Sequence, residues 1–284
     1  MKKYLDYSIK YWKEIPTKPV NTLQFFITNQ CNLRCKACFY AHKLGKKEMS
    51  FKDYSDYITK YEKNIDKIII LGGEPTLHKD LPIMIKLNQN LKLKTTVYTN
   101  GFNLKNLENI NLNNVTIRIG VYGSKSSEKP LNKIKTKLPV TIVYMLRKDN
   151  VKELMETAKI AEKKFNCKDF YISSIRDISI TGNYWHDTKD TISNDEYFKI
   201  VQDFIQKYKG KLNLHIALRG VIKSKIEPKT KCCRFGNIFP DKTIIQCPLD
   251  ISLKKTTKKL NYGKNKCNKD KRCILRKMIL QRKV

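Results

Sequence analysis

Residues 25 to 40 read Phe-Phe-Ile-Thr-Asn-Gln-Cys-Asn-Leu-Arg-Cys-Lys-Ala-Cys-Phe-Tyr. The apolar start predicts a buried strand that leads directly into a loop with three thiols, Cys31, Cys35 and Cys38. Iron-sulfur clusters are held by several cysteine sulfurs that converge from one turn. This Cys-x3-Cys-x2-Cys spacing therefore predicts a [4Fe-4S] cluster with three protein ligands and one iron left open.

This spacing, directly after a strand, resembles the cluster loop of the radical S-adenosylmethionine (radical SAM) superfamily. The resemblance implies that the methionine moiety of SAM chelates the open iron, and that the reduced cluster splits SAM to give a 5'-deoxyadenosyl radical. A zinc knuckle is the alternative, but zinc sites usually pair two Cys-x2-Cys or Cys/His sets, and only His42 lies nearby. The family often places an aromatic residue just before the third cysteine, whereas here Ala37 precedes it and Phe39 and Tyr40 follow it.

The length of 284 residues is enough for one sizeable core and a small appendage. The chain starts without a signal peptide, and no apolar run reaches the ~20 residues of a membrane span, so we expect a cytoplasmic protein. Nine cysteines in a reducing compartment favour metal ligation over disulfides. The net charge of +32 suggests nucleic acid, but only nine of the 58 basic residues are Arg, the residue that phosphate recognition favours. Nucleic-acid binding is therefore the less favoured interpretation.

Short apolar runs alternate with amphipathic segments along most of the chain, which predicts βαβ units and a parallel sheet. With the first strand, five further strands complete the partial (β/α)6 barrel that the resemblance implies for residues 21–220. Residues 1–20 are expected to form an N-terminal helical extension. The further strands are expected at 67–71, 94–99, 115–122, 140–146 and 169–174, with helices at 50–64, 80–91, 127–137, 151–165 and 193–209, and another strand at 212–218.

Polar motifs follow the predicted strands at their carboxyl ends, where barrels of this kind place their chemistry. A Gly pair lets the backbone approach a ligand without an intervening Cβ. The resemblance implies that Gly-Gly-Glu after the second strand holds the amino group of SAM, and that groups after the third and fourth strands contact the rest of it. The predicted cofactor-binding residues are Gly72, Gly73, Glu74, Thr99, Asn100 and Ser124.

Arginine is scarce in this chain, so an Arg at a strand end is a candidate for forked binding of a carboxylate or phosphate. Arg147 and Arg176 follow predicted strands and are candidate catalytic residues. Cys232 is a third candidate, because a free thiol can donate a hydrogen atom to a carbon radical.

Beyond residue 230 the alternation stops and cysteines return, with a predicted hairpin at 233–247 and a final helix at 271–281. Residues 221–284 resemble the auxiliary-cluster domains, called SPASM or twitch, that follow many radical SAM barrels. The resemblance implies one second [4Fe-4S] cluster, because too few cysteines are present for two. Zinc suits the same residue types, and Cys232 could replace Cys233. The predicted ligands are Cys233, Cys247, Cys267 and Cys273.

These features together predict a radical SAM enzyme that abstracts a substrate hydrogen. The resemblance favours modification of a ribosomally made peptide, helped by the auxiliary cluster and an electron donor such as flavodoxin or ferredoxin. A dehydrogenase of a small sugar or amino alcohol is the first alternative. The second alternative is an iron-sulfur or zinc protein that binds nucleic acid. Only the net charge favours this alternative.

Overall fold

A computed structural model of the chain describes residues 5–6, 22–36, 38, 40–174, 190–216 and 235–245. The helices are α2 (Phe51–Tyr61), α3 (Leu81–Asn90), α4 (Lys105–Glu108), α5 (Leu154–Lys164) and α6 (Asn194–Lys207), with short 3-10 turns between elements. The strands are β1 (Leu5–Asp6), β2 (Thr22–Phe26), β3 (Lys67–Leu71), β4 (Lys94–Thr99), β5 (Val115–Val121), β6 (Pro139–Leu146), β7 (Asn166–Ser174), β8 (Asn213–Ile216), β9 (Phe235–Ile238) and β10 (Ile244–Ile245).

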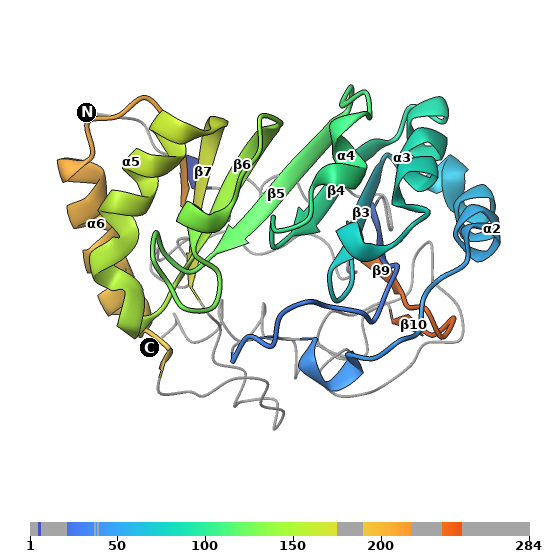
Figure 1. Cartoon of the computed structure of the whole chain (residues 1–284), viewed down its shortest axis with the longest axis horizontal. Helices are drawn as coiled ribbons and strands as arrows, with labels where there is room; N and C mark the ends of the chain where they lie inside the picture. Colours follow the sequence, from blue (N-terminus) through green and yellow to red (C-terminus); the bar gives the residue numbers. More distant parts are fainter. Residues whose placement is uncertain are drawn as a thin grey trace, which may run out of the picture.

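All described strands belong to one sheet in the order β1-β8-β7-β6-β5-β4-β3-β2-β9-β10. Every neighbouring pair is parallel except the β9–β10 hairpin. The sheet is curved, and the four longer helices lie at its flanks (Figure 1). This arrangement confirms the predicted α/β class, with a mostly parallel sheet that forms a partial barrel.

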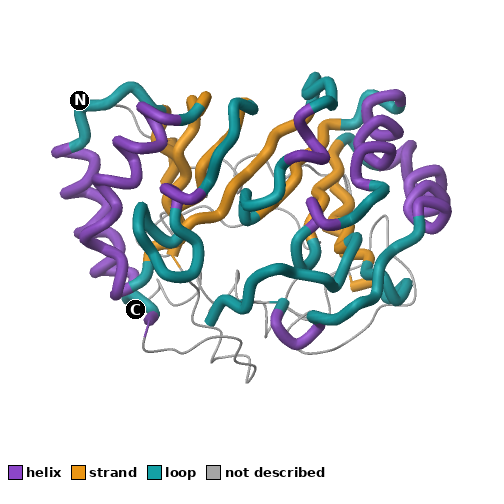
Figure 2. Tube along the Cα trace, in the orientation of Figure 1, coloured by secondary structure: helices purple, strands orange, loops and turns teal. Residues whose placement is uncertain are grey.

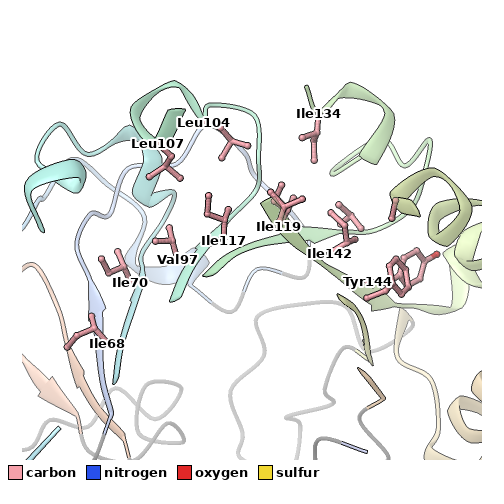
Figure 3. Close-up of a cluster of buried hydrophobic side chains, with 14 of the residues drawn as sticks. Ile68, Ile70, Val97, Leu104, Leu107, Ile117, Ile119, Ile134, Ile142 and Tyr144 are labelled. Carbon is pink, nitrogen blue, oxygen red and sulfur yellow. The ribbon is translucent and has the colours of Figure 1, made fainter. Parts of the chain in front are cut away.

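The hydrophobic core lies between the sheet and its helices. Alternate residues of each strand point to this face, among them Ile68 and Ile70 of β3 and Ile117 and Ile119 of β5, with Leu107 of α4 opposite (Figure 3). Each is almost fully buried, and burying such a side chain contributes about 1.5–3 kcal/mol. The core fixes the register of the strands, because a shift by one residue would turn the other face of each strand towards the helices.

The opposite, inner face of the sheet carries polar and aromatic side chains. Arg118 lies between two core residues of β5, and its guanidinium donates to the hydroxyl groups of Tyr98 at 2.7 Å and Tyr171 at 3.3 Å. The Tyr171 ring stacks on His215, whose Nε2 lies 2.7 Å from Asp169. The inner face is therefore a hydrogen-bonded layer rather than a second apolar core.

The helix starts predicted at Ser50 and Ser193 are confirmed by side-chain caps. Ser50 accepts a hydrogen bond from the amide of Asp53 at 3.0 Å, and Ser193 accepts one from the amide of Glu196 at 3.2 Å. These side chains satisfy amides that have no partner within their helices. Among the described ranges, no helix has the length and apolar character of a membrane span.

The predicted helix at 127–137 is wrong, because only a 3-10 turn at Leu131–Lys133 forms there. Pro130 lacks a backbone N–H and disfavours helical geometry at the preceding residue. The segment instead folds back, and the amide of Leu131 donates to the carbonyl of Gly123 at 2.9 Å. This turn matters for function because it brings residues 128–130 to the carboxyl end of β5.

The helix expected over residues 1–20 is wrong at Leu5 and Asp6, the two positions of that segment which the structure describes. They form β1, which pairs with His215 and Ile216 of β8. An edge strand offers a row of free backbone hydrogen-bonding groups, so an extended segment gains partners there that a helix could not use.

The predicted hairpin after residue 233 forms as β9 and β10, with a turn at Pro240 and Asp241. It adds to the barrel sheet, because β9 pairs in parallel with β2 from Thr22 to Phe25. The domain boundary expected at residue 220 falls outside the described residues and stays a prediction. The hairpin itself is continuous with the sheet that carries the cysteine loop.

Candidate active site

The cysteine loop (residues 27–45) leaves the carboxyl end of β2 and passes below the strand ends, with one short helical turn near its end (Figure 2). Cys31, Cys35 and Cys38 are half-buried free thiols on this loop. The amide of Leu33 donates to the sulfur of Cys31 at 3.4 Å, and the amide of Cys38 donates to the carbonyl of Cys35 at 3.2 Å. Backbone hydrogen bonds thus shape the loop, and one of them reaches the sulfur of Cys31.

Burial raises the pKa of Cys35 to about 11, although the positive charge of Lys129 acts in the opposite direction. Burial also raises the pKa of Cys31, against the hydrogen bond from Leu33. The charge of Cys38 raises the pKa of both, so the thiols are close enough to influence one another. Among the described residues no three metal-binding side chains converge on a single point. In a cubane each thiolate binds a different iron, so three separate thiols are the ligand set that such a cluster would need.

Aromatic rings anchor the end of the cysteine loop. Phe26, the last residue of β2, stacks on Tyr40 with ring centroids 4.8 Å apart and on Phe239 at 4.5 Å. The hydroxyl group of Tyr40 donates to Asn29 at 2.7 Å. Tyr40 is therefore a buried structural anchor that joins the loop to β2 and to the hairpin.

The glycine pair after β3 packs against the cysteine loop. A Cβ at Gly73 would lie 2.2 Å from the carbonyl oxygen of Gln30, and a Cβ at Gly72 would lie 2.5 Å from that of Thr28. The amides of Gly73 and Glu74 donate to these two carbonyl groups, each at 2.7 Å. The two glycines thus allow β3 to pack closely against the backbone of the cysteine loop. Their contact with a ligand stays a prediction.

Glu74 is buried and connects the ends of β3 and β4. Its Oε1 accepts from the Thr76 hydroxyl and the Thr99 hydroxyl, both at 2.6 Å, and from the Thr76 amide at 3.1 Å. Its Oε2 accepts from the amide of Asn100 at 2.7 Å. The side chain of Asn100 then donates to Asn32 in the cysteine loop at 2.7 Å. Sequence analysis placed Glu74, Thr99 and Asn100 at one site, and the structure brings them into a single network.

Ser124 lies in the turn after β5 and is fully buried. Its hydroxyl group donates to Glu153 at 3.0 Å, and the amide of Lys125 donates to the same carboxylate oxygen at 2.8 Å. Glu153, which sequence analysis did not single out, thus ties this turn to the start of α5. The hydrogen bond described for the Ser124 hydroxyl group is thus with Glu153 of this chain, and its contact with a cofactor stays a prediction.

Arg147 follows β6, and the carboxylates described beside its guanidinium belong to this chain, so its catalytic role stays a prediction. It pairs with Asp149, lies 3.5 Å from Glu128 and sits over the Tyr122 ring at 4.7 Å. Burial acts against the charged form, but Asp149 and Glu128 outweigh it and raise the pKa of Arg147 above its usual range. The side chain is therefore a charged, buried link between two loops at the strand ends.

Lys129 was missed by sequence analysis. Its ammonium group lies 3.9 Å from where a Cβ of Gly120 would stand, on the inner face, and 5.3 Å from the centre of the Tyr122 ring. Burial lowers its pKa, but Tyr122, Cys35, Cys38 and Glu74 together outweigh burial, and the pKa of Lys129 is raised. The positive charge of Lys129 thus interacts electrostatically with the thiols of Cys35 and Cys38. Gly120 of β5 has no side chain and so leaves room for the Lys129 side chain. The lysine reaches this place only because the loop after β5 folds back.

The remaining predicted site residues lie outside the described residues. They are the candidate Arg176 and the cysteines Cys232, Cys233, Cys247, Cys267 and Cys273. Their roles stay predictions.

Comparison with known proteins gives one family model, described as Radical SAM superfamily, which matches residues 25–173, just over half of the chain. A similar curated protein is the GTP 3',8-cyclase of Campylobacter jejuni subsp. doylei, 26% identical over 181 residues, which cover 54% of this chain and 57% of that protein. The chain therefore spans little more than half the length of this relative.

Among solved structures, Streptococcus suis SuiB bound to precursor peptide SuiA matches with a TM-score of 0.68 and 19% identity, covering 95% of this chain and 68% of SuiB. Native anSMEcpe with bound AdoMet and Cp18Cys peptide matches with a TM-score of 0.55 and 13% identity, covering 93% of this chain and 79% of that one. At these identities the two matches establish the fold.

Proposed function

The chain belongs to the radical SAM superfamily, and from this we propose that Cys31, Cys35 and Cys38 bind a [4Fe-4S] cluster and that SAM binds beside it. When bound, this cofactor pair supplies the radical that abstracts a hydrogen from the substrate. The observation that carries the proposal is the network of Glu74, Thr99 and Asn100, which joins the strand ends directly to the cysteine loop.

We assign positioning roles to the network residues. Glu74 holds the loops after β3 and β4 together, and Asn100 fixes the cysteine loop through Asn32. The backbone of Gly72 and Gly73 then lies against the thiol-bearing segment, where a carbonyl group can accept from the amino group of SAM. Ser124 acts through Glu153 by fixing the turn that carries Lys129 to the site.

Lys129 supplies the charge that complements the carboxylate of SAM in this proposal. Replacing Lys129 with Met keeps the length of the side chain and removes the ammonium group, so we expect the Kd for SAM to rise about tenfold, as loss of one charge-assisted hydrogen bond predicts. KM for SAM should rise with a smaller change in kcat. The measurement is SAM binding to the anaerobically reconstituted protein by equilibrium dialysis.

Lys125→Met is the matched control, because Lys125 lies on the same turn but is exposed, with its ammonium group 3.8 Å from Glu156. It should bind SAM as the unchanged protein does. Equal affinities for the Lys129→Met variant and the unchanged protein would remove Lys129 from the site.

For the substrate, we propose a ribosomally made peptide. The likeness in fold to SuiB and anSMEcpe, both solved with peptides, supports this class. The similarity to a GTP 3',8-cyclase supports a small-molecule substrate as the second candidate. The earlier alternative of a sugar or amino-alcohol dehydrogenase belongs to that second class, whereas membership of an enzyme superfamily speaks against a purely nucleic-acid-binding protein.

Further parts of the proposal concern residues outside the described ranges. Cys233, Cys247, Cys267 and Cys273 are proposed to hold a second [4Fe-4S] cluster, with Cys232 as an alternative ligand and zinc as the alternative metal. A flavodoxin or ferredoxin is the proposed electron donor, and the cytoplasm, where thiols stay reduced, is the proposed location.

The test is anaerobic reconstitution followed by incubation with SAM and dithionite. We expect about eight irons per chain, since two four-iron clusters are proposed, and formation of 5'-deoxyadenosine. A short peptide encoded beside the gene should change in mass when added, whereas GTP should not be consumed. Consumption of GTP without any change to the peptide would favour the small-molecule candidate, and absence of 5'-deoxyadenosine would contradict the proposed activity itself.

A further inference from the structure

A pocket opens at the amino ends of β3, β4 and β5, at the opposite end of these strands from the cysteine loop. It has a volume of about 310 Å³, and its lining includes three basic residues and three threonines: Lys67, Lys94, Arg118, Thr95, Thr96 and Thr116. Lys67 and Gly72 stand at opposite ends of the β3 segment, so roughly 16 Å of strand separates this basic pocket from the proposed SAM site. It is therefore a different site.

The strand pairing brings the basic residues together. Lys67 stands directly beside Lys94 in the β3–β4 register, and Arg118 lies on the next strand. Lys67 is half-buried, whereas most lysines of a Lys-rich chain extend into solvent. The pocket thus combines the half-buried Lys67 with the exposed Lys94, which the strand register holds side by side.

The charges in the basic pocket repel one another. Burial lowers the pKa of Lys67 most, and the positive charges of Arg118 and Lys94 lower it further. The negative charge of Asp66 acts in the opposite direction. The guanidinium of Arg118 donates hydrogen bonds to the hydroxyl groups of Tyr98 and Tyr171, which restrict its position on the pocket wall. Holding like charges at a concave, partly dry site costs free energy unless an anion offsets them.

From these observations we propose that the basic pocket binds a phosphate-bearing small molecule. Three cations in one hollow match a group with two or more negative charges, and hydroxyl groups of threonines provide neutral donors for its oxygens. The volume is at the lower end of ligand pockets, which suits a phosphate or diphosphate group with a small substituent. Because the pocket lies at the far end of the strands, the ligand is an effector or a stabilising anion rather than the substrate of the radical reaction.

The test uses the full chain as purified, with inorganic phosphate and pyrophosphate as probes and sodium chloride at equal ionic strength as the reference. At 100 times its Kd, pyrophosphate should raise Tm by about 5 °C, as expected for a ligand that binds only the folded state of a protein of this size. Chloride should leave Tm nearly unchanged. A rise with chloride equal to that with pyrophosphate would overturn the proposal, because general screening of the net charge would then explain it.

The Lys67→Met variant distinguishes an effect on anion binding from an effect on the stability of the fold. This variant should melt no lower than the unchanged chain in anion-free buffer, because it removes a half-buried, repelled charge, yet its Kd for pyrophosphate should be about tenfold weaker. Lys86→Met, an equal change of charge at an exposed position of α3, should retain the full response. A Lys67→Met variant that responds to pyrophosphate as the unchanged chain does would overturn the proposal.

Discussion

Replacing Cys35 with Ala is expected to abolish formation of 5'-deoxyadenosine and to reduce the iron content by about four per chain after anaerobic reconstitution. The proposed cluster has only three protein ligands, so loss of one leaves two thiolates for four irons. Cys35 lies half-buried on the cysteine loop, outside the main core, so the fold should survive. The measurements are iron and sulfide content, with product analysis by chromatography.

Cys167→Ala is the matched control. Cys167 is also a half-buried free thiol, but it lies at the amino end of β7, and its sulfur donates to the carbonyl of Asp169 at 3.4 Å. This variant should keep both its iron and its activity. Retention of iron and product by Cys35→Ala would show that the cysteine loop does not hold the cluster.

Much of the fold could be predicted because local pattern and tertiary structure agree. The apolar run at Lys67–Leu71 and the capped helix after Ser50 need no distant information, and both form as predicted. Where a distant partner decides the structure, prediction from the sequence failed. Leu5 and Asp6 are extended because β8 offers an edge, and residues 127–137 fold back because Pro130 prevents a helix and the turn after β5 accepts them.

The candidate site was predictable in its residues but not in their contacts. Glu74, Thr99 and Asn100 stand at successive strand ends, and a parallel sheet brings such ends to one edge. That the glycine pair packs on Thr28 and Gln30 follows only from the path of the cysteine loop.

The side chains that line the inner face were missed for a different reason. Arg118 stands between two isoleucines and His215 stands between Leu214 and Ile216, an alternation that marks a polar face. This signal was present in the sequence. The alternation could be interpreted only with the knowledge that the inner face of this barrel is polar. In most parallel sheets both faces are buried and apolar.

Replacing Glu74 with Gln is expected to lower both the stability of the protein and its affinity for SAM. Glutamine keeps the shape but offers one oxygen and one NH2 group to four donor contacts, so at least one buried donor faces another donor. An unsatisfied buried group costs about 1–3 kcal/mol, which sets the expected loss in the free energy of unfolding. The measurements are urea unfolding and SAM binding.

The order of these effects tests whether Glu74 acts by positioning. Glu74→Ala removes every acceptor and should cost more than Glu74→Gln in both measurements, whereas Glu156→Gln, at an exposed residue of α5, should change neither. If Glu74 touched SAM without holding the loops, the Gln variant would weaken binding at unchanged stability. Because the carboxylate is buried and joins the turns after β3 and β4, we expect stability and affinity to fall together.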